Sequence, residues 1–486
     1  MTVTTFHGLG QRILRELHGQ AGLPADFQVA DEAAVAEVAA EVATKAAAEA
    51  AAGRAGLVAA LTARGLVDFD GLIELAAAVL RGDPGQAAAL RERWPLISVD
   101  EYQDIDAAQY ELLSLLAGAG AGLTVIGDPD QAIYGFRGAD VRFFLQFAAD
   151  FPGAVTCALS RNYRSSRPIV AAIAPVTLVP GRALHAVRDG AAEPVIAHES
   201  ADEHAEAGWI SATIDQLLGG TSFHSIDSGR ASGDGQTGLS LADIAVLYRT
   251  DAQSAALGQA LTRSGLPFRK GSHDLLYRRP GVPEILAEME ILAGLERDRQ
   301  PGHGPGDQPD DQPVAALVAA AAARLAGRPS RYRAVDIRAA AQLLAPLARR
   351  CGRDRERFAT ETALGAEVDA LDPRADAVTL LTMHAAKGLE FEVVFVAGCE
   401  DGLLPLRTPG GGVLPGTDVQ EERRLLFVAL TRARARLLIS YAARRARRGE
   451  AAPAGASPFL RELGPVLAAG SVPRPRRADQ RQLRLL

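Results

Sequence analysis

Two short apolar runs, Pro95-Leu96-Ile97-Ser98-Val99 and Leu123-Thr124-Val125-Ile126, decide how this 486-residue sequence is interpreted. The first is followed by Asp100-Glu101-Tyr102-Gln103-Asp104 and the second by Gly127-Asp128-Pro129-Asp130-Gln131. Apolar runs of this length that end abruptly in polar residues are typical of buried parallel strands. The leucine-rich stretch 105–117 between them contains no Gly or Pro and predicts the crossover helix of a βαβ unit.

The polar residues after the two strands predict a ligand site, because ligands of parallel sheets bind at the carboxyl ends of the strands. Asp100, Glu101, Asp128 and Gln131 would meet at that edge. One carboxylate can hold Mg²⁺ when phosphate oxygens supply most of its ligands, and a second can orient or deprotonate an attacking water. The alternative is that Asp100 and Glu101 only cap the next helix, where acids are favoured. The second acid-ended strand favours nucleotide chemistry.

Residues 100–104 and the string 127–139, Gly-Asp-Pro-Asp-Gln-Ala-Ile-Tyr-Gly-Phe-Arg-Gly-Ala, resemble motifs II and III of the UvrD/Rep/PcrA helicases of superfamily 1. The other motifs of that family follow in the same order. The resemblance implies an α/β fold with two RecA-like parallel-sheet motor domains and helical insert subdomains. It also implies ATP and Mg²⁺ as cofactors, Asp100 as the metal ligand, and Glu101 and Gln131 as catalytic residues that contact the nucleotide.

Composition limits the class of protein less sharply. The net charge of −7 gives no global basic excess, although nucleic-acid binding needs only a local basic stripe. Cys157, Cys351 and Cys399 are isolated and form neither a disulfide framework nor a zinc motif. No signal peptide opens the chain and no apolar run is long enough to span a bilayer, so we expect a cytoplasmic protein without a membrane partner.

Further segments resemble the DNA-contact motifs of the family. The segment Thr4-Thr5-Phe6-His7 implies a contact of His7 with the strand backbone, although such a triplet also occurs at ordinary strand ends. Tyr134, Phe136 and Arg137 lie in a glycine-containing stretch, which favours an exposed loop over a place in the core. Aromatic rings on such a loop can stack on unpaired bases.

The remaining motifs belong to the second motor domain. Residues 159–166 resemble motif IV and imply that Arg164 reaches the γ-phosphate, a role that suits a planar guanidinium. Residues 421–433 resemble motif VI, in which Arg432 would be a second arginine finger that stabilises developing charge. A solvated surface position is the alternative for both arginines, and the order of the motifs outweighs it.

Two strands complete this set of predicted contacts. Residues 377–391 resemble motif V and imply that Thr382 and His384 contact DNA and that Glu390 binds the nucleotide sugar. The strand that ends in Arg249 resembles a family segment near DNA or phosphate.

Composition and motif order divide the chain into segments. The first motor domain covers 1–155, truncated at its N-terminus, with a small helical insert at about 20–66. The second covers 156–290 and 376–446, with a short helical insert subdomain at 291–375. A basic, flexible tail follows over 447–486. Its end, Gln482–Leu486, resembles peptides that bind the bacterial sliding clamp, with a frayed leucine-rich end as the alternative.

The sequence contains no G-x-x-x-x-G-K-[ST] phosphate-binding loop, which in this family comes before the Thr-Phe-His segment. Such a loop cradles phosphates with its amides and neutralises them with its lysine. The strand that carries it would be missing too, and the neighbouring strands would expose their edges. We therefore expect an incomplete chain, or else a split protein or an inactive relative. We expect little ATPase activity from these residues alone.

The resemblance extends from the Thr-Phe-His segment to motif VI. It implies ATP-driven 3′ to 5′ movement along single-stranded DNA, with unwinding at single/double-strand junctions in replication or repair. Two alternatives stay open. One is a module that binds single-stranded DNA without turning over ATP, and the other is an interaction protein recruited by its tail.

Overall fold

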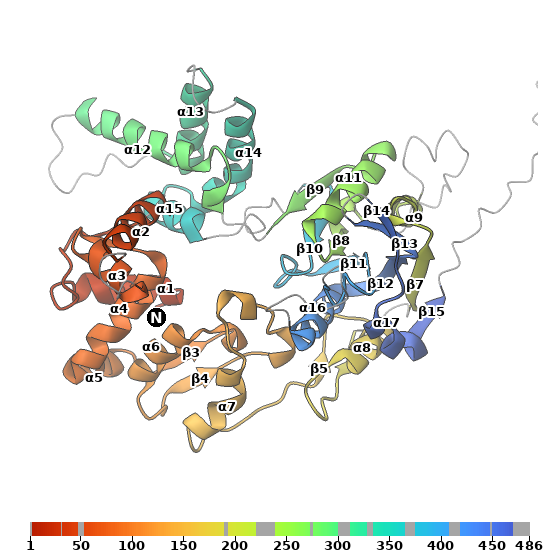
Figure 1. Cartoon of the computed structure of the whole chain (residues 1–486), viewed down its shortest axis with the longest axis horizontal. Coiled ribbons are helices and arrows are strands. Elements are labelled where there is room, and N and C mark those ends of the chain that lie inside the picture. The colour runs from red at the N-terminus through yellow and green to blue at the C-terminus, as the bar shows by residue number, and fades with distance from the viewer. Residues whose placement is uncertain are drawn as a thin grey trace, which may run out of the picture. The chain divides into compact units, whose positions relative to one another are not determined.

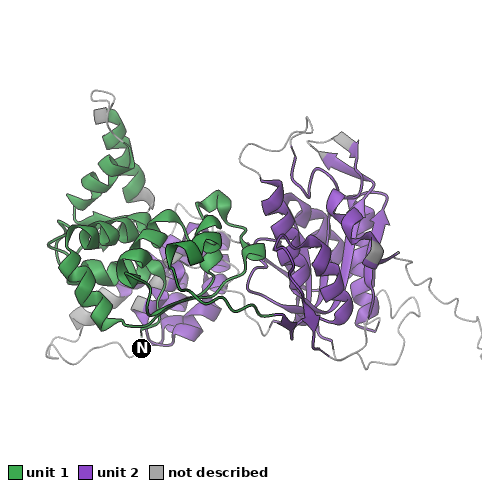
Figure 2. Cartoon of the chain, turned by 90° about the horizontal axis from the view of Figure 1, so that it is seen from below, with its two compact units in different colours: residues 1–159 green, residues 160–486 purple. Residues whose placement is uncertain are grey.

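A computed structural model of this chain divides into two compact units, residues 1–159 and 160–486 (Figure 2). The structure describes residues 2–30, 32–46, 53–188, 193–219, 239–272, 276–299, 312–327, 334–364, 375–407, 418–447 and 450–469. No helix in these ranges is both long and apolar enough to cross a membrane. The proposed clamp-binding peptide Gln482–Leu486 lies outside the described residues.

Unit 1 contains the predicted βαβ unit. Its elements are β3 (Ile97–Val99), α6 (Ala107–Ala117) and β4 (Leu123–Val125). The strands pair in parallel, with Ile97 opposite Leu123. The Asp106 side chain caps α6 by accepting a hydrogen bond from the Gln109 amide, and the leucines that face the core are buried. This confirms the predicted strands and their crossover helix.

Further helices of unit 1 pack beside this βαβ unit (Figure 1). α1 (Phe6–Glu16), α4 (Phe69–Gly82) and α5 (Pro84–Arg93) share one apolar core with α6. The side chains of Thr5, Asp68 and Asp83 cap these three helices. The segment predicted as a small insert contains α2 (Glu32–Ala46) and α3 (Arg54–Thr62), and β1 (Gln28–Val29) pairs there with β2 (Leu66–Val67). α7 (Arg142–Asp150) follows later in the unit.

Unit 2 is built on a seven-stranded sheet in which every pair is parallel, in the order β15-β7-β12-β11-β8-β10-β9. Its strands are β7 (Val195–Ser200), β8 (Ile244–Tyr248), β9 (Phe268–Gly271), β10 (Val378–Thr382), β11 (Phe391–Val396), β12 (Ala433–Ala442) and β15 (Leu467–Ala469). The central strands β8, β10 and β11 are buried over nearly their whole length, as expected when both faces of a parallel sheet are covered. The α/β fold class is confirmed.

Helices supply that cover. α9 (Glu203–Leu217) and α11 (Ser254–Arg263) share an apolar core with the sheet. α8 (Arg167–Ile173) and α16 (Val419–Thr431) pack against each other and against β12. A short parallel pair, β5 (Arg161–Asn162) and β6 (His185–Ala186), precedes and follows α8 in the chain.

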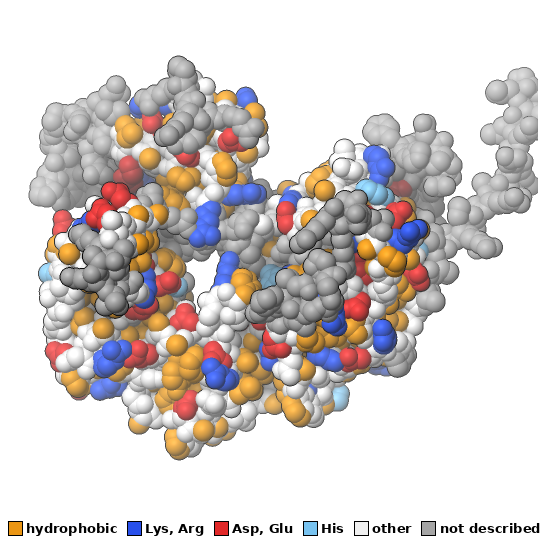
Figure 3. All heavy atoms as spheres, viewed as in Figure 1, with side chains coloured by type: hydrophobic (Ala, Val, Ile, Leu, Met, Phe, Trp, Pro, Cys, Tyr) orange, Lys and Arg blue, Asp and Glu red, His pale blue; other side chains and the backbone are white. Residues whose placement is uncertain are grey.

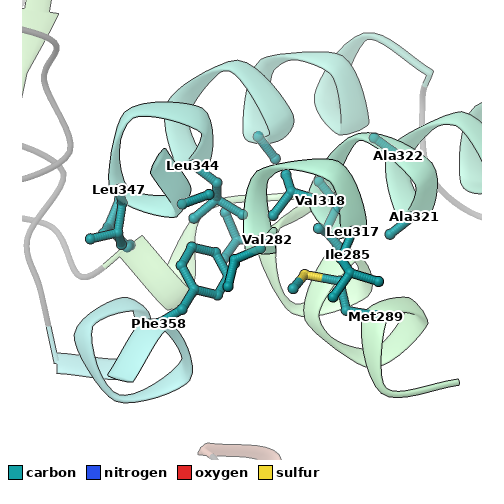
Figure 4. Packing of buried hydrophobic residues seen from close by; sticks show 14 of the residues in the cluster. Val282, Ile285, Met289, Leu317, Val318, Ala321, Ala322, Leu344, Leu347 and Phe358 are labelled. Atoms are coloured by element: carbon teal, nitrogen blue, oxygen red, sulfur yellow. The ribbon is translucent and has the colours of Figure 1, made fainter. Parts of the chain in front are cut away.

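A separate helical cluster lies between β9 and β10 in the sequence, where a helical insert is predicted. It consists of α12 (Val282–Arg299), α13 (Val314–Ala326), α14 (Ala334–Cys351) and α15 (Arg355–Leu364). Its buried side chains form a core of their own, in which Phe358 lies close to Val282 and Leu344 (Figure 4).

A flexible tail was expected from residue 447, but residues 450–469 of that segment are folded. β13 (Arg444–Arg447) and β14 (Glu450–Pro453) form a hairpin, α17 (Pro458–Leu463) follows, and β15 joins the sheet beside β7. Phe459, Leu460 and Leu463 are buried. The basic, Pro-containing composition suggested disorder, but three apolar anchors and a free sheet edge are enough to fix this segment.

Candidate functional site

The two parallel strands of unit 1 bring their polar ends to one edge. Asp100 and Glu101 directly follow β3 and are exposed, and Asp128 follows β4 after two residues. Beyond the strands, the Tyr102 amide donates to the Ile126 carbonyl at 2.9 Å, so the two segments stay together. The structure thus brings together the acids predicted from motifs II and III.

Glu101 has an unusual backbone conformation. With φ 52° and ψ 39°, it is the one non-glycine residue with positive φ in the described part of the chain. A left-handed conformation costs an L-residue roughly 1–2 kcal/mol, and it persists only where the surroundings hold it. One such contact is the hydrogen bond that the Glu101 amide donates to Asp100 Oδ1 at 2.9 Å.

Gln103 connects the two strand ends and was given no role from the sequence. Its side chain has no exposed surface. Its Nε2 donates to Glu101 Oε2, and its Oε1 accepts from the Asp128 amide at 2.9 Å. Asp128 in turn accepts a hydrogen bond from Gln131 Nε2 at 3.0 Å. The only sequence signal was a glutamine inside a run of acids, and its burial cannot be inferred from that pattern.

Asp100 is the predicted Mg²⁺ ligand. No group of three or more His, Cys, Asp or Glu side chains among the described residues is placed to hold a metal ion. Mg²⁺ needs only one or two carboxylates when a nucleotide supplies phosphate oxygens. The residues therefore fit an ion that arrives with its nucleotide, and do not fit a metal held by the protein alone.

The stretch after β4 carries the predicted stacking residues. Phe136 is 62% exposed in a single 3-10 turn, Gly135–Arg137. The rings of Tyr134 and Phe136 lie 6.3 Å apart at 61°, and the Arg137 guanidinium carbon lies 5.7 Å from each ring. Phe136 is thus on the surface, whereas Tyr134 is partly buried, and neither ring is fully enclosed as the core alternative would require.

Apolar side chains near the two-stranded sheet of unit 1 are also exposed. Leu96, Ile126 and Leu145 are 83%, 52% and 64% exposed. Figure 3 shows hydrophobic side chains gathered over β4 and α7. Among the described residues β4 pairs with β3 alone, so its other edge can accept a further strand.

The predicted DNA contact His7 lies near the start of α1. Its ring stacks on Phe69 with 3.7 Å between centroids. Burial lowers the pKa of His7 to about 4, against a smaller opposing effect of Asp106. The ring is therefore neutral at pH 7 and partly enclosed, so His7 offers a DNA phosphate no positive charge.

Unit 2 brings Arg164 and Glu390 together. Arg164 Nε donates to Glu390 Oε2 at 2.6 Å, and both side chains are about two-fifths exposed, at 38% and 43%. Glu390 also lies 3.7 Å from Arg434, which pairs with Glu392 at 3.2 Å. Arg188 pairs with Glu392 at 2.8 Å. We call these five residues the Arg164 cluster.

The other two predicted arginines point into unit 2. Arg432 is 2% exposed and donates to the carbonyls of Val428 and Leu389 at 3.0 and 3.2 Å, and also to the Thr431 hydroxyl. Arg249 donates two hydrogen bonds to the Glu422 carboxylate, from Nε to Oε2 at 3.0 Å and from Nη2 to Oε1 at 2.6 Å. This pair is nearly buried. As placed, both guanidiniums are committed to the fold of their own unit.

Thr382 and His384 stand at the carboxyl end of β10, and both are partly exposed. Thr382 Oγ1 accepts a hydrogen bond from the Ala385 amide at 3.2 Å, which shapes the turn that leads to His384. The structure places both at the same end of the sheet as the residue after β8, Arg249, because β10 pairs with β8 in parallel.

Comparisons with known proteins agree on one family. The profile of the UvrD/REP helicase N-terminal domain matches residues 43–152, and that of the UvrD-like helicase C-terminal domain matches residues 157–298 and 353–444. The chain is 32% identical over 426 residues to the ATP-dependent DNA helicase UvrD2 of Mycobacterium tuberculosis, covering 85% of this chain and 57% of that protein. It is 27% identical over 479 residues to the ATP-dependent DNA helicase PcrA of Leuconostoc citreum, covering 82% and 61%.

DNA helicase II of Escherichia coli is 29% identical over 573 residues, covering 95% of this chain and 77% of that protein. The chain spans about three-fifths of the length of the UvrD2 and PcrA relatives.

Proposed function

We propose that this chain, which belongs to the family of UvrD-like helicases, forms the motor core of an ATP-dependent DNA helicase that moves 3′ to 5′ along single-stranded DNA. The observation that carries the proposal is the shared edge of β3 and β4, where Asp100, Glu101, Asp128 and Gln131 meet. An exposed acid pair at the carboxyl ends of parallel strands suits phosphoryl transfer to water.

In this proposal Asp100 would hold the Mg²⁺ that accompanies ATP, and that ion would neutralise charge on the phosphates. Glu101 orients and deprotonates the attacking water. Gln131, whose side-chain amide donates to Asp128 at this edge, would contact the terminal phosphate or the attacking water. These three side chains supply the catalytic groups of unit 1.

Arg164 and Glu390 supply the groups of unit 2. A half-exposed guanidinium can leave Glu390 for a phosphate, and Glu390 is then available to a ribose hydroxyl. Arg432 can act as a second finger only by leaving two backbone carbonyls, so we assign the direct phosphate contact to Arg164.

Tyr134, Phe136 and Arg137 form the proposed stacking surface for unpaired bases. Thr382 and His384 add polar contacts to the strand backbone. Replacing Phe136 by Ala should weaken binding to a fluorescent oligothymidylate roughly tenfold, because stacking is worth about 1–3 kcal/mol per base. Val155→Ala, at an exposed apolar position of the same unit, is the control.

ATP turnover also needs a phosphate-binding loop, and none occurs in the 486 residues. The open edge of β4 is where we propose that the strand carrying such a loop would pair. We therefore expect DNA binding with little ATP hydrolysis from the chain alone. DNA-stimulated hydrolysis is expected only from a form that also carries such a loop.

Hydrolysis should be measured for both forms, each with and without Glu101→Gln. Strong turnover by the chain alone, abolished by Glu101→Gln, would contradict the need for a separate loop. Absence of turnover in both forms, with DNA binding intact, would favour the alternative function of a single-strand-binding module.

A further inference from the structure

A buried amide joins the two acid-ended strands of unit 1. Gln103 Nε2 donates to Glu101 and lies 3.5 Å from Asp104 Oδ2, while Oε1 accepts from the Asp128 backbone amide at 2.9 Å. A glutamine can donate and accept at once without carrying a charge. A glutamate here would repel Glu101, and a leucine would bond to neither partner.

The neighbouring backbone is shaped to admit this amide. A Cβ atom at Gly127 would lie 2.5 Å from Gln103 Oε1 and 2.8 Å from Phe144 Cε2. A larger residue at position 127 would therefore displace the Gln103 side chain. Positions 103 and 127, which follow two different strands, thus depend on one contact.

We propose that Gln103 is a positioning residue for ATP hydrolysis. It holds Glu101 in its left-handed conformation, aims the Glu101 carboxylate, and ties that carboxylate to the Asp128 peptide. This inference rests on the proposed function, in which Glu101 activates water. Because Asp128 leads directly to Gln131 and then to the Tyr134–Phe136 pair, movement of that segment is transmitted through Gln103 to the catalytic carboxylate.

Three variants of the full chain separate the two bonds. Gln103→Glu keeps an acceptor for the Asp128 amide but loses the donor to Glu101. Gln103→Leu loses both. Gln146→Glu makes the same chemical change at an exposed position of α7 and is the matched control.

Two NMR readouts report on the two bonds. The ¹³Cα and ¹³Cβ shifts of Glu101 report its left-handed backbone, and amide exchange reports the bond of Asp128. We expect Gln103→Glu to shift only the Glu101 signals. We expect Gln103→Leu to shift them and to speed Asp128 exchange about fivefold, the effect of one lost neutral hydrogen bond. Gln146→Glu should change neither.

Unchanged Glu101 shifts and Asp128 exchange in both Gln103 variants would overturn the proposal. Gly127→Ala, which displaces the same amide from the other strand, should reproduce the Gln103→Leu pattern and replaces that variant if it does not fold. In a form that hydrolyses ATP, Gln103→Glu should lower kcat at least about tenfold with little change in KM for ATP. The NMR result needs no turnover, so failure of hydrolysis in every form would count against the proposed function alone.

Discussion

Two clusters in unit 2 pair arginine with glutamate but differ in their surroundings. In the Arg164 cluster the side chains are partly exposed and the carboxylate of Glu390 faces two arginines. In the second cluster Arg445 lies between Glu206 and Glu400, and all three are at most 9% exposed. Both glutamates there also accept bonds from backbone amides, those of Gly398 and Ala442.

The contrast separates two uses of the same chemistry. A buried ion pair that loses one partner leaves an uncompensated charge, whereas an exposed pair exchanges its partners for water or ligand at small cost. We therefore interpret the Arg445 cluster as part of the fold, and the Arg164 cluster as groups that a ligand can recruit. The predictions below test this division.

The two tryptophans allow each unit to be followed by itself. Trp94 lies in unit 1 and Trp209 in unit 2. Trp209 stacks on His198 with 4.2 Å between ring centroids and adjoins Phe395 in the core of the sheet. Fluorescence of a Trp94→Phe variant during urea unfolding therefore reports unit 2, and Trp209→Phe reports unit 1.

The largest effect is expected for Arg445→Met. This change leaves the carboxylates of Glu206 and Glu400 buried without their cation, and burial already raises the pKa of Glu400. We expect unit 2 to lose about 3–5 kcal/mol of unfolding free energy in the Trp94→Phe background. Arg436→Met, in β12, breaks an exposed pair with Glu193 and should cost under about 1 kcal/mol. Equal losses of unfolding free energy in the two variants would contradict the distinction between buried and exposed ion pairs.

Arg249→Met should come next. The side chains of Arg249 and Glu422 are 15% and 4% exposed, so this pair is slightly more accessible to solvent than the Arg445 cluster. Loss of its bidentate bonds should lower the stability of unit 2 by about 2–3 kcal/mol. Affinity for an oligothymidylate, measured well below the unfolding temperature, should stay within about twofold of the parent protein. A large loss of DNA affinity with unchanged stability would restore the role predicted from the sequence.

In unit 1, the partly enclosed His7 ring makes the same distinction between buried and exposed groups testable through the pH dependence of stability. The folded pKa of about 4 lies below the ordinary value of 6.5, so the unfolded chain binds the proton more readily. The stability contributed by neutral His7 is therefore present above pH 6.5 and is lost as pH falls toward 4. Between pH 8 and pH 5 this amounts to about 2 kcal/mol. Urea unfolding of the Trp209→Phe form should show this loss, and His7→Gln should reduce it.

An unchanged pH dependence in the His7→Gln variant would show that the ring is not enclosed. His18 is a histidine of the same unit for which the sequence gives no role, and His18→Gln is the control.

These residues show what the sequence could and could not reveal. Apolar runs and motif order predicted β3, β4, β8, β11 and the acids at the edge of unit 1, because strand polarity and length fix which ends meet. They did not reveal that Arg249 and Arg432 are turned inward. The sequence alone does not distinguish an arginine that binds a phosphate from one that pairs with a buried carboxylate or carbonyl.

The other features that the sequence did not predict depend on partners that are far apart in the chain. Arg445 reaches Glu206 across more than two hundred residues, and the pairing of β15 with β7 folds a segment whose composition resembles a disordered tail. Gln103 was visible in the motif, but its role follows from burial and from two bonds that only the packed strands create.

The smallest change in stability is expected for Arg164→Gln, although its effect on function should be large. Loss of a pair that is about two-fifths exposed should cost unit 2 under about 1 kcal/mol, because water replaces Glu390 as the partner. In an ATP-hydrolysing form, the same change should lower kcat by roughly 10³-fold, the magnitude typical of an arginine finger.

Glu390→Gln, which removes the other half of the pair, should have an equally small effect on the stability of unit 2. It should raise KM for ATP more than it lowers kcat, since its proposed partner is the sugar. If Arg164→Gln instead destabilised unit 2 as strongly as Arg445→Met, both clusters would be structural, and the phosphate contact would have to come from another arginine.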